Sequence, residues 1–256
     1  MIQDLPIDAA HAAALARWQA PFPGFTSGHD PRTSDNALLA LLYGGLAHAA
    51  DHEWLNAGRR LIDKTYIDML WHVQALTDMR TCRPEQIAAA LDGFVQGTVS
   101  SHWVGLTSLA SREKEILAIN WVEEVARTCF GSLHSEPAAS RLLFYLCPML
   151  PVFNLSRGHL HALDELGHGC ANDSYAAYAL SANAAYRRLM PLLCSFSRPS
   201  TVFGNPVEQA LIQRLLQESD WWPRRIFDAL LLQMIGSPRV GDRSLFACDD
   251  SGQMMP

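Results

Sequence analysis

Lysine is nearly absent from this 256-residue chain. Of its 20 basic residues only Lys64 and Lys114 are lysines, and the others are arginines. A mechanism that needs a nucleophilic amine is therefore restricted to two positions. Charge is also scarce, because charged residues make up 18% of the chain, where about 25% is usual. With a formal net charge of −6, any surface that neutralises phosphates must be local.

The sequence also lacks the short motifs that mark common enzyme sites. It contains no G-x-x-x-x-G-K-[ST] phosphate loop, no G-x-G-x-x-G dinucleotide motif and no G-x-S-x-G nucleophile elbow. Nucleotide hydrolysis, dinucleotide redox chemistry and serine-elbow hydrolysis therefore have no positive support in the sequence.

Paired cysteines and long apolar runs are missing as well. The six cysteines form no C-x-x-C pair, and their irregular spacing is typical of reduced core residues. The first residues show no basic stretch followed by an apolar one, so we expect no signal peptide. The longest apolar run, 37–50, is too short to cross a membrane. We therefore expect a cytoplasmic protein without a membrane partner.

What the sequence does contain is a helical pattern in a chain that is 49% hydrophobic. Apolar residues recur at three- and four-residue steps, and no convincing two-residue alternation occurs. We expect an all-α fold with one domain of about nine or ten helices over residues 1–236 and a polar tail over residues 237–256. The ranges predicted to be helical are 7–20, 35–48, 51–77, 84–95, 111–129, 138–147, 157–167, 174–196, 207–217 and 223–235.

Two groups of histidines are candidates for a metal or general-base site. His48 and His52 are four residues apart, so on a continuous helix they would share a face, as the ligands of metal-binding helices do. His159, His161 and His168 form a second group. The alternative is that these side chains lie at a helix junction and on the solvated side of a short helix. A histidine-site enzyme, with or without a metal, is one hypothesis for the function.

Segment 220–228 has the most unusual composition. Trp221 and Trp222 precede the expected start of the last helix, and Arg224 and Arg225 occupy its first turns, where the helix dipole disfavours cations. One interpretation is a phosphate site with indole faces available for stacking. The alternative is that Trp221 belongs to the core and the arginines form ion pairs on the surface.

Residues 139–154 read Ala-Ser-Arg-Leu-Leu-Phe-Tyr-Leu-Cys-Pro-Met-Leu-Pro-Val-Phe-Asn. This stretch resembles a pattern of the 8-oxoguanine DNA glycosylase fold in the helix-hairpin-helix superfamily. There, a short Ser/Thr-Lys-x-Leu-x-Phe helix is followed by a Pro-rich turn and an aspartate. Proteins of that fold bind duplex DNA and excise a damaged base that has been flipped out of the stack.

This chain departs from that pattern at two positions. Arg141 stands where the pattern has lysine, and arginine cannot form a Schiff base. Asn154 stands where it has aspartate, and an amide cannot act as a carboxylate. The resemblance therefore implies a member without the lyase chemistry, or a helical scaffold put to another use.

The leading hypothesis is a non-catalytic or catalytically altered helical protein that binds DNA or a DNA-associated partner, with no cofactor and no metal. The residues predicted to contact phosphates and bases are Arg141, Arg157, Trp221, Trp222, Arg224 and Arg225. A third hypothesis is a protein-interaction module or homo-oligomer, in which the many apolar residues would partly cover an interface.

Overall fold

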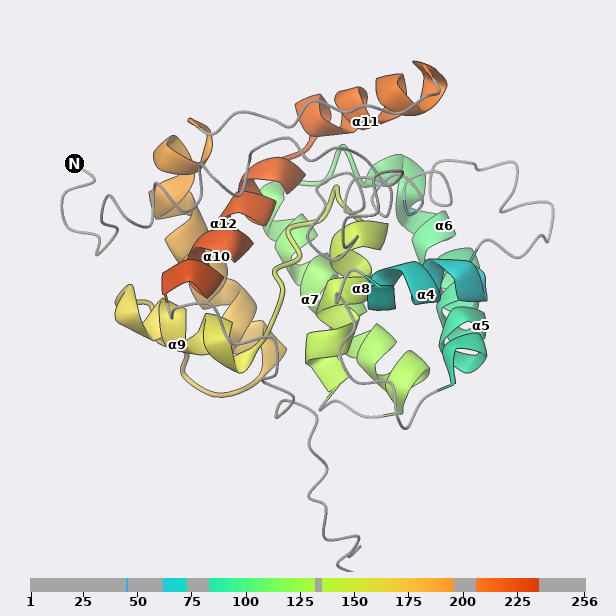
Figure 1. Cartoon of the computed structure of the whole chain (residues 1–256), viewed down its shortest axis with the longest axis horizontal. Coiled ribbons are helices and arrows are strands. Elements are labelled where there is room, and N and C mark those ends of the chain that lie inside the picture. The colour runs from blue at the N-terminus through green and yellow to red at the C-terminus, as the bar shows by residue number, and fades with distance from the viewer. Residues whose placement is uncertain (1–44, 46–61, 73–82, 132–134, 196–205, 235–256) are drawn as a thin grey trace, which may run out of the picture.

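The computed structural model describes residues 45, 62–72, 83–131, 135–195 and 206–234, and these ranges contain helices and loops but no strand (Figure 1). Eight helices in these ranges have nine residues or more, against nine or ten predicted for the whole chain. They are α4 (Lys64–His72), α5 (Pro84–Phe94), α7 (Ser111–Phe130), α8 (Glu136–Leu146), α9 (Arg157–Glu165), α10 (Tyr175–Leu193), α11 (Pro206–Glu218) and α12 (Trp221–Met234). The all-α prediction is thereby confirmed. The helices predicted at 7–20 and 35–48 and the predicted tail lie outside the described residues.

Helix ends follow the expected chemistry at several positions. Ser156 and Ser174 cap α9 and α10, since each hydroxyl oxygen accepts from a backbone N–H three residues later, at 3.2 and 3.3 Å. Gly131 ends α7 with a φ of 71°, a conformation that glycine adopts without strain. At the start of α7, Ser111 is the first helical residue, and the Ala110 N–H donates to the Glu113 carboxylate at 2.9 Å.

Three helix boundaries differ from the prediction. The range 51–77 is not one helix, because Ile62 and Asp63 are non-helical and α4 begins at Lys64. Ile62 is nevertheless buried, so the apolar period continues through the break and hides it. Beyond α5 the helical path continues as a π-helix, Val95–Val99, which the usual period cannot reveal. The last helix starts at Trp221, ahead of Pro223, because proline is tolerated in the first turn of a helix.

Two groups of helices meet along α7 and α10 (Figure 1). Helices α4, α5, α7 and α8 pack in one group, and α9, α10 and α12 in the other. The non-helical residues 147–156, here called the crossing segment, run between α8 and α12 in Figure 1. No helix within the described ranges is long and apolar enough to span a membrane.

The core is continuous across both groups and contains much of the aromatic content. Phe144 of α8 packs against Trp221 of α12, with ring centroids 5.5 Å apart. The four cysteines in the described residues are free thiols, as predicted, and Cys129 and Cys147 are buried. A core of this extent gives the folded chain its stability without a covalent link among those four thiols.

Gly45 marks a close approach between backbones. It is buried, and a Cβ added to it would overlap the carbonyl oxygen of Tyr145 in α8. We expect Gly45→Ala to lower the free energy of unfolding by about 1–3 kcal/mol, because a backbone atom cannot move aside as a flexible side chain can. Urea denaturation measures the change.

Gly93→Ala is the matched control for this substitution. Gly93 lies inside α5, and an added Cβ meets no atom within 4 Å. Alanine there should be neutral or stabilising by about 0.5–1 kcal/mol, since it favours the helix. Equal stability of the two variants would contradict the close approach at Gly45.

Candidate functional site

A buried carboxylate on α12 gathers polar groups from three parts of the fold. Oδ1 of Asp228 lies 2.8 Å from Nε2 of His159 and accepts from Nδ2 of Asn154 at 3.1 Å. Oδ2 accepts from the Arg225 guanidinium at 2.8 Å. Asp228, His159 and Asn154 are all at least 90% buried. A charge is kept in this position because its oxygens are hydrogen-bonded on all sides.

His159 is held from both sides of its ring. Its Nδ1 lies 2.5 Å from the hydroxyl of Ser156, the capping residue of α9. Because the Asp228 carboxylate can only accept, Nε2 carries a proton, and the Ser156 hydroxyl donates to Nδ1 when the ring is neutral. The first turn of α9 thereby fixes the ring that meets Asp228.

Ser156, His159 and Asp228 are the residue types of a hydrolytic triad, but their surroundings do not suit that chemistry. Ser156 is buried, and its hydroxyl oxygen accepts the capping N–H of α9. The adjoining void of about 170 Å³ is walled by aromatic side chains, among them Phe144 and Phe227, and is too narrow to hold a water molecule. A substrate therefore has no room beside the Ser156 hydroxyl. The role of Ser156, His159 and Asp228 that the structure supports is to connect α9 to α12.

The electrostatics of the network favour the ionised form of Asp228. Burial alone would raise the pKa of this carboxyl group. The hydrogen bond and charge interaction with His159, the charge of Arg225 and the amide of Asn154 outweigh burial and lower the pKa to about 2. Asp228 is therefore a permanent anion at neutral pH.

Positions 141 and 154, at which the chain departs from the glycosylase pattern, converge on this carboxylate. Burial lowers the pKa of Arg141, and the charge of Asp228 acts in the opposite direction, which places the guanidinium close enough to Asp228 to interact with it. Asn154 donates to Asp228 directly. The carboxylate at this junction comes from α12, 74 residues after position 154.

Three of the six predicted nucleic-acid contacts are core residues. Trp221, Trp222 and Arg224 are 0%, 2% and 1% exposed. The Trp221 indole N–H donates to the carbonyl of Phe144 at 3.1 Å. A stacking platform and a phosphate contact at these three positions are contradicted, because protein atoms enclose the indoles and the guanidinium. The alternative interpretation of segment 220–228 is confirmed for Trp221, which lies in the core, and is wrong for Arg224, which is buried and not part of a surface ion pair.

Arg224 joins α12 to the crossing segment. Its guanidinium donates to the carbonyl of Val152 at 2.9 Å and to that of Pro148 at 2.5 Å, and its Nε donates to Asp220 at 3.2 Å. Two of these three donors of Arg224 point inward to the crossing segment, and the third points along α12 to Asp220. The guanidinium at the start of α12, where the helix dipole disfavours a cation, therefore satisfies two buried carbonyls.

The other three predicted residues, Arg141, Arg157 and Arg225, reach the surface to different extents; they are called the arginine cluster below. Arg157 is exposed at the first position of α9, whereas Arg141 and Arg225 are partly buried. The Leu155 N–H donates to the Ser140 hydroxyl at 3.1 Å, which ties α8 to the crossing segment between Arg141 and Arg157. Of these three guanidinium groups, those of Arg141 and Arg225 interact with the Asp228 carboxylate, which makes a local excess of positive charge in an acidic protein.

The second histidine group, predicted as a metal or general-base site, is not brought together by the fold. His159 is buried in the network, while His161 is exposed and lies 3.9 Å from Glu165. Within the described ranges, no group of three His, Cys, Asp or Glu side chains is arranged to hold a metal ion. A ligand set made of His159, His161 and His168 is therefore wrong. His48 and His52 lie outside the described residues.

Sequence inspection missed the role of Asp228, although a signal for it exists. Trp221, Arg224 and Asp228 are spaced three and four residues apart and share one face of α12. A tryptophan on the same face as two charges indicates that the charges are buried and paired. The contact of Ser156 with His159 depends on the orientation of the imidazole ring, which no sequence pattern gives.

No protein-family model, curated protein or solved structure matches this chain. The function is therefore inferred from the geometry of the network and the arginine cluster.

Proposed function

We propose that this chain is a non-catalytic helical protein that binds DNA through the arginine cluster. The main support is the convergence of Arg141 and Asn154 on Asp228, because both residues belong to the segment that resembles a DNA-binding fold. Arg157, exposed at the start of α9, supplies the most accessible cation. A DNA-associated protein with an acidic surface is the alternative partner for the same cations.

Electrostatics favour a phosphate ligand at this place. Arg157 is the first residue of α9, so an anion that contacts it also lies near the positive end of the helix dipole. Arg141 and Arg225 add positive charge beside Asp228, which offsets only part of that charge. Because the whole chain carries −6, binding should depend on this cluster and not on a general attraction to DNA.

The absence of lyase chemistry follows from the residues present. Position 141 carries no amine, and the only two lysines of the chain lie elsewhere, with Lys64 paired to Glu85 at 3.1 Å and Lys114 on α7. Asp228 cannot act as a free base, since His159, Asn154 and Arg225 occupy its oxygens. Among the described residues of the cluster and its network, neither an amine nucleophile nor a free general base is available.

Fluorescence anisotropy with a labelled DNA duplex at about 50 mM salt tests the proposal. We expect saturable binding by the full chain, and Arg157→Gln should weaken it about three- to tenfold, because one phosphate contact is lost. Substitution of this exposed residue should leave the thermal melt unchanged.

Arg214→Gln is the matched control, because Arg214 is an exposed arginine on α11, far from α9 in Figure 1, where it pairs with Glu218 at 2.8 Å. It should bind DNA as the unaltered protein does. No binding to duplex or single-stranded DNA, or an equal loss in both variants, would contradict the proposal.

A further inference from the structure

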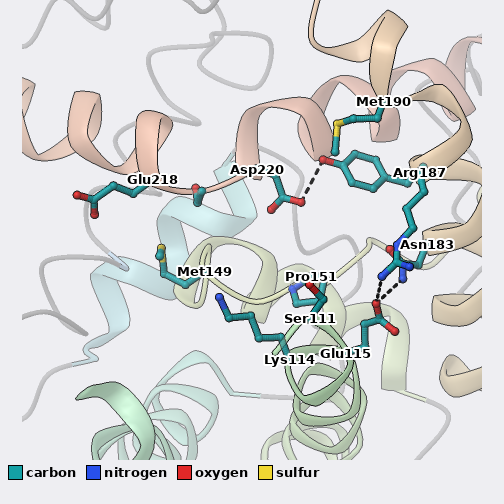
Figure 2. A pocket seen from close by; sticks show the side chains of 12 residues that line it. Ser111, Lys114, Glu115, Met149, Pro151, Asn183, Arg187, Met190, Glu218 and Asp220 are labelled. Atoms are coloured by element: carbon teal, nitrogen blue, oxygen red, sulfur yellow. Dashed lines mark hydrogen bonds and ion pairs between the residues drawn. The ribbon is translucent and has the colours of Figure 1, made fainter. Parts of the chain in front are cut away.

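An open cleft of about 310 Å³ lies between α7, α10 and the junction of α11 with α12 (Figure 2). None of the arginine cluster lines it, so it is separate from the proposed DNA contact. Its volume is at the lower end of the range for small-molecule sites, about 300–1,000 Å³. A ligand here would be a small metabolite-sized molecule.

One wall of the cleft presents carboxylates that keep free capacity. Asp220 accepts from the Tyr186 hydroxyl at 3.1 Å and from Arg224, yet its side chain is 45% exposed. Glu218 pairs with Arg214 and is 50% exposed. Each carboxylate has about four acceptor positions, so both can receive a further donor from a ligand.

The opposite side presents two cations, Lys114 and Arg187, of which Arg187 pairs with Glu115. Figure 2 shows Lys114 of α7 extending into the opening, in the direction of Met149. Lys114 is half-buried, and its ammonium group makes no hydrogen bond or ion pair with any residue that the structure describes. The neighbouring Glu115 is already occupied, because the Asn183 amide and the Arg187 guanidinium both donate to it.

Apolar side chains complete the cleft. Met149, Pro151 and Met190 line it between the charged walls. Methionine is unbranched and polarizable, so it adapts to the shape of an apolar group placed against it.

We propose that this cleft binds a small zwitterion with an apolar side chain. The carboxylate of the ligand pairs with Lys114, its ammonium group with Asp220 and Glu218, and its side chain packs on Met149 and Met190. An anion without the ammonium group would face two carboxylates, and a cation without the carboxylate would face Lys114. Only a ligand with both charges satisfies both walls.

Isothermal titration calorimetry of the full chain with three probes of similar shape tests this proposal. L-leucine carries both charges, isocaproate lacks the ammonium group and isoamylamine lacks the carboxylate. We expect saturable binding of leucine and at least tenfold weaker binding of the other two, because each of these leaves one charged wall without a partner.

Variants locate the binding in the cleft. Lys114→Met and Glu218→Gln should each weaken leucine binding about tenfold, whereas Lys114→Arg should retain it, and a circular dichroism melt shows that each variant is folded. Lys64→Met is the control, since the other lysine of the chain pairs with Glu85 outside the cleft. No saturable heat with leucine, equal binding of the three probes, or an equal loss in Lys64→Met would overturn the proposal.

Discussion

Replacing Asp228 with asparagine is expected to lower the free energy of unfolding by about 3–5 kcal/mol, because it removes a buried carboxylate that interacts with two guanidinium groups and with His159. Arg225 donates to this carboxylate, and the charge of Arg141 interacts with it. Without the anion, both guanidinium groups remain in a poorly hydrated environment. Urea denaturation followed by circular dichroism measures the loss.

Asp173→Asn is the control, since Asp173 is exposed before α10. The Asp173→Asn substitution should change the free energy of unfolding by no more than about 0.5 kcal/mol. A loss at Asp228 no larger than this would show that the network contributes little to stability.

The pH dependence of stability gives a second readout of the same group. The pKa of Asp228 is lowered from 3.8 to about 2 in the folded protein. The contribution of the ionised form is therefore complete above the unfolded value of 3.8 and disappears as the pH falls towards 2, a difference of about 2 kcal/mol. The Asp228→Asn variant should lack this part of the acid-induced loss.

Arg224→Met is expected to destabilise the protein by about 2–5 kcal/mol, since a side chain of similar length cannot donate hydrogen bonds. The carbonyls of Pro148 and Val152 would remain buried without the donors they have now. The stability of Arg224→Lys should lie between that of the unaltered protein and that of Arg224→Met. An ammonium group keeps the charge, but it cannot donate to both carbonyls at once as the planar guanidinium does. Urea denaturation provides the comparison.

The control for Arg224 is an arginine whose ion pair lies in solvent. Arg187 is 61% exposed and pairs with Glu115. Arg187→Met should cost less than about 1 kcal/mol, since surface pairs are screened. Comparable losses of unfolding free energy in Arg187→Met and Arg224→Met would contradict the role of Arg224 as a donor to buried carbonyls.

The helices could be predicted from the sequence because their signals are local. Ser156 and Ser174 cap α9 and α10, and Gly131 ends α7, each within a few residues of the helix that it limits. The break at Asp63 and the π-helix after Phe94 could not be predicted, because buried apolar residues continue through both. The spacing of apolar residues indicates which residues are buried, and buried residues continue through positions at which the backbone leaves the α-helical conformation.

The site was predicted less well, because its contacts join distant residues. Asn154 and His159 meet Asp228 across 74 and 69 residues, and no spacing rule covers such pairs. Arg224 was assigned to a surface for the same reason, since its acceptors are carbonyls of the crossing segment. The predicted nucleic-acid contacts of Arg141 and Arg157 stay predictions.

The salt dependence of DNA binding tests the proposed role of the arginine cluster most directly. If the three arginines contact phosphates, the logarithm of the binding constant should fall with the logarithm of salt concentration with a slope of about −2 to −3, and Arg157→Gln should make the slope shallower by about 0.9. A slope near zero, or one that Arg157→Gln leaves unchanged, would contradict phosphate recognition by these residues.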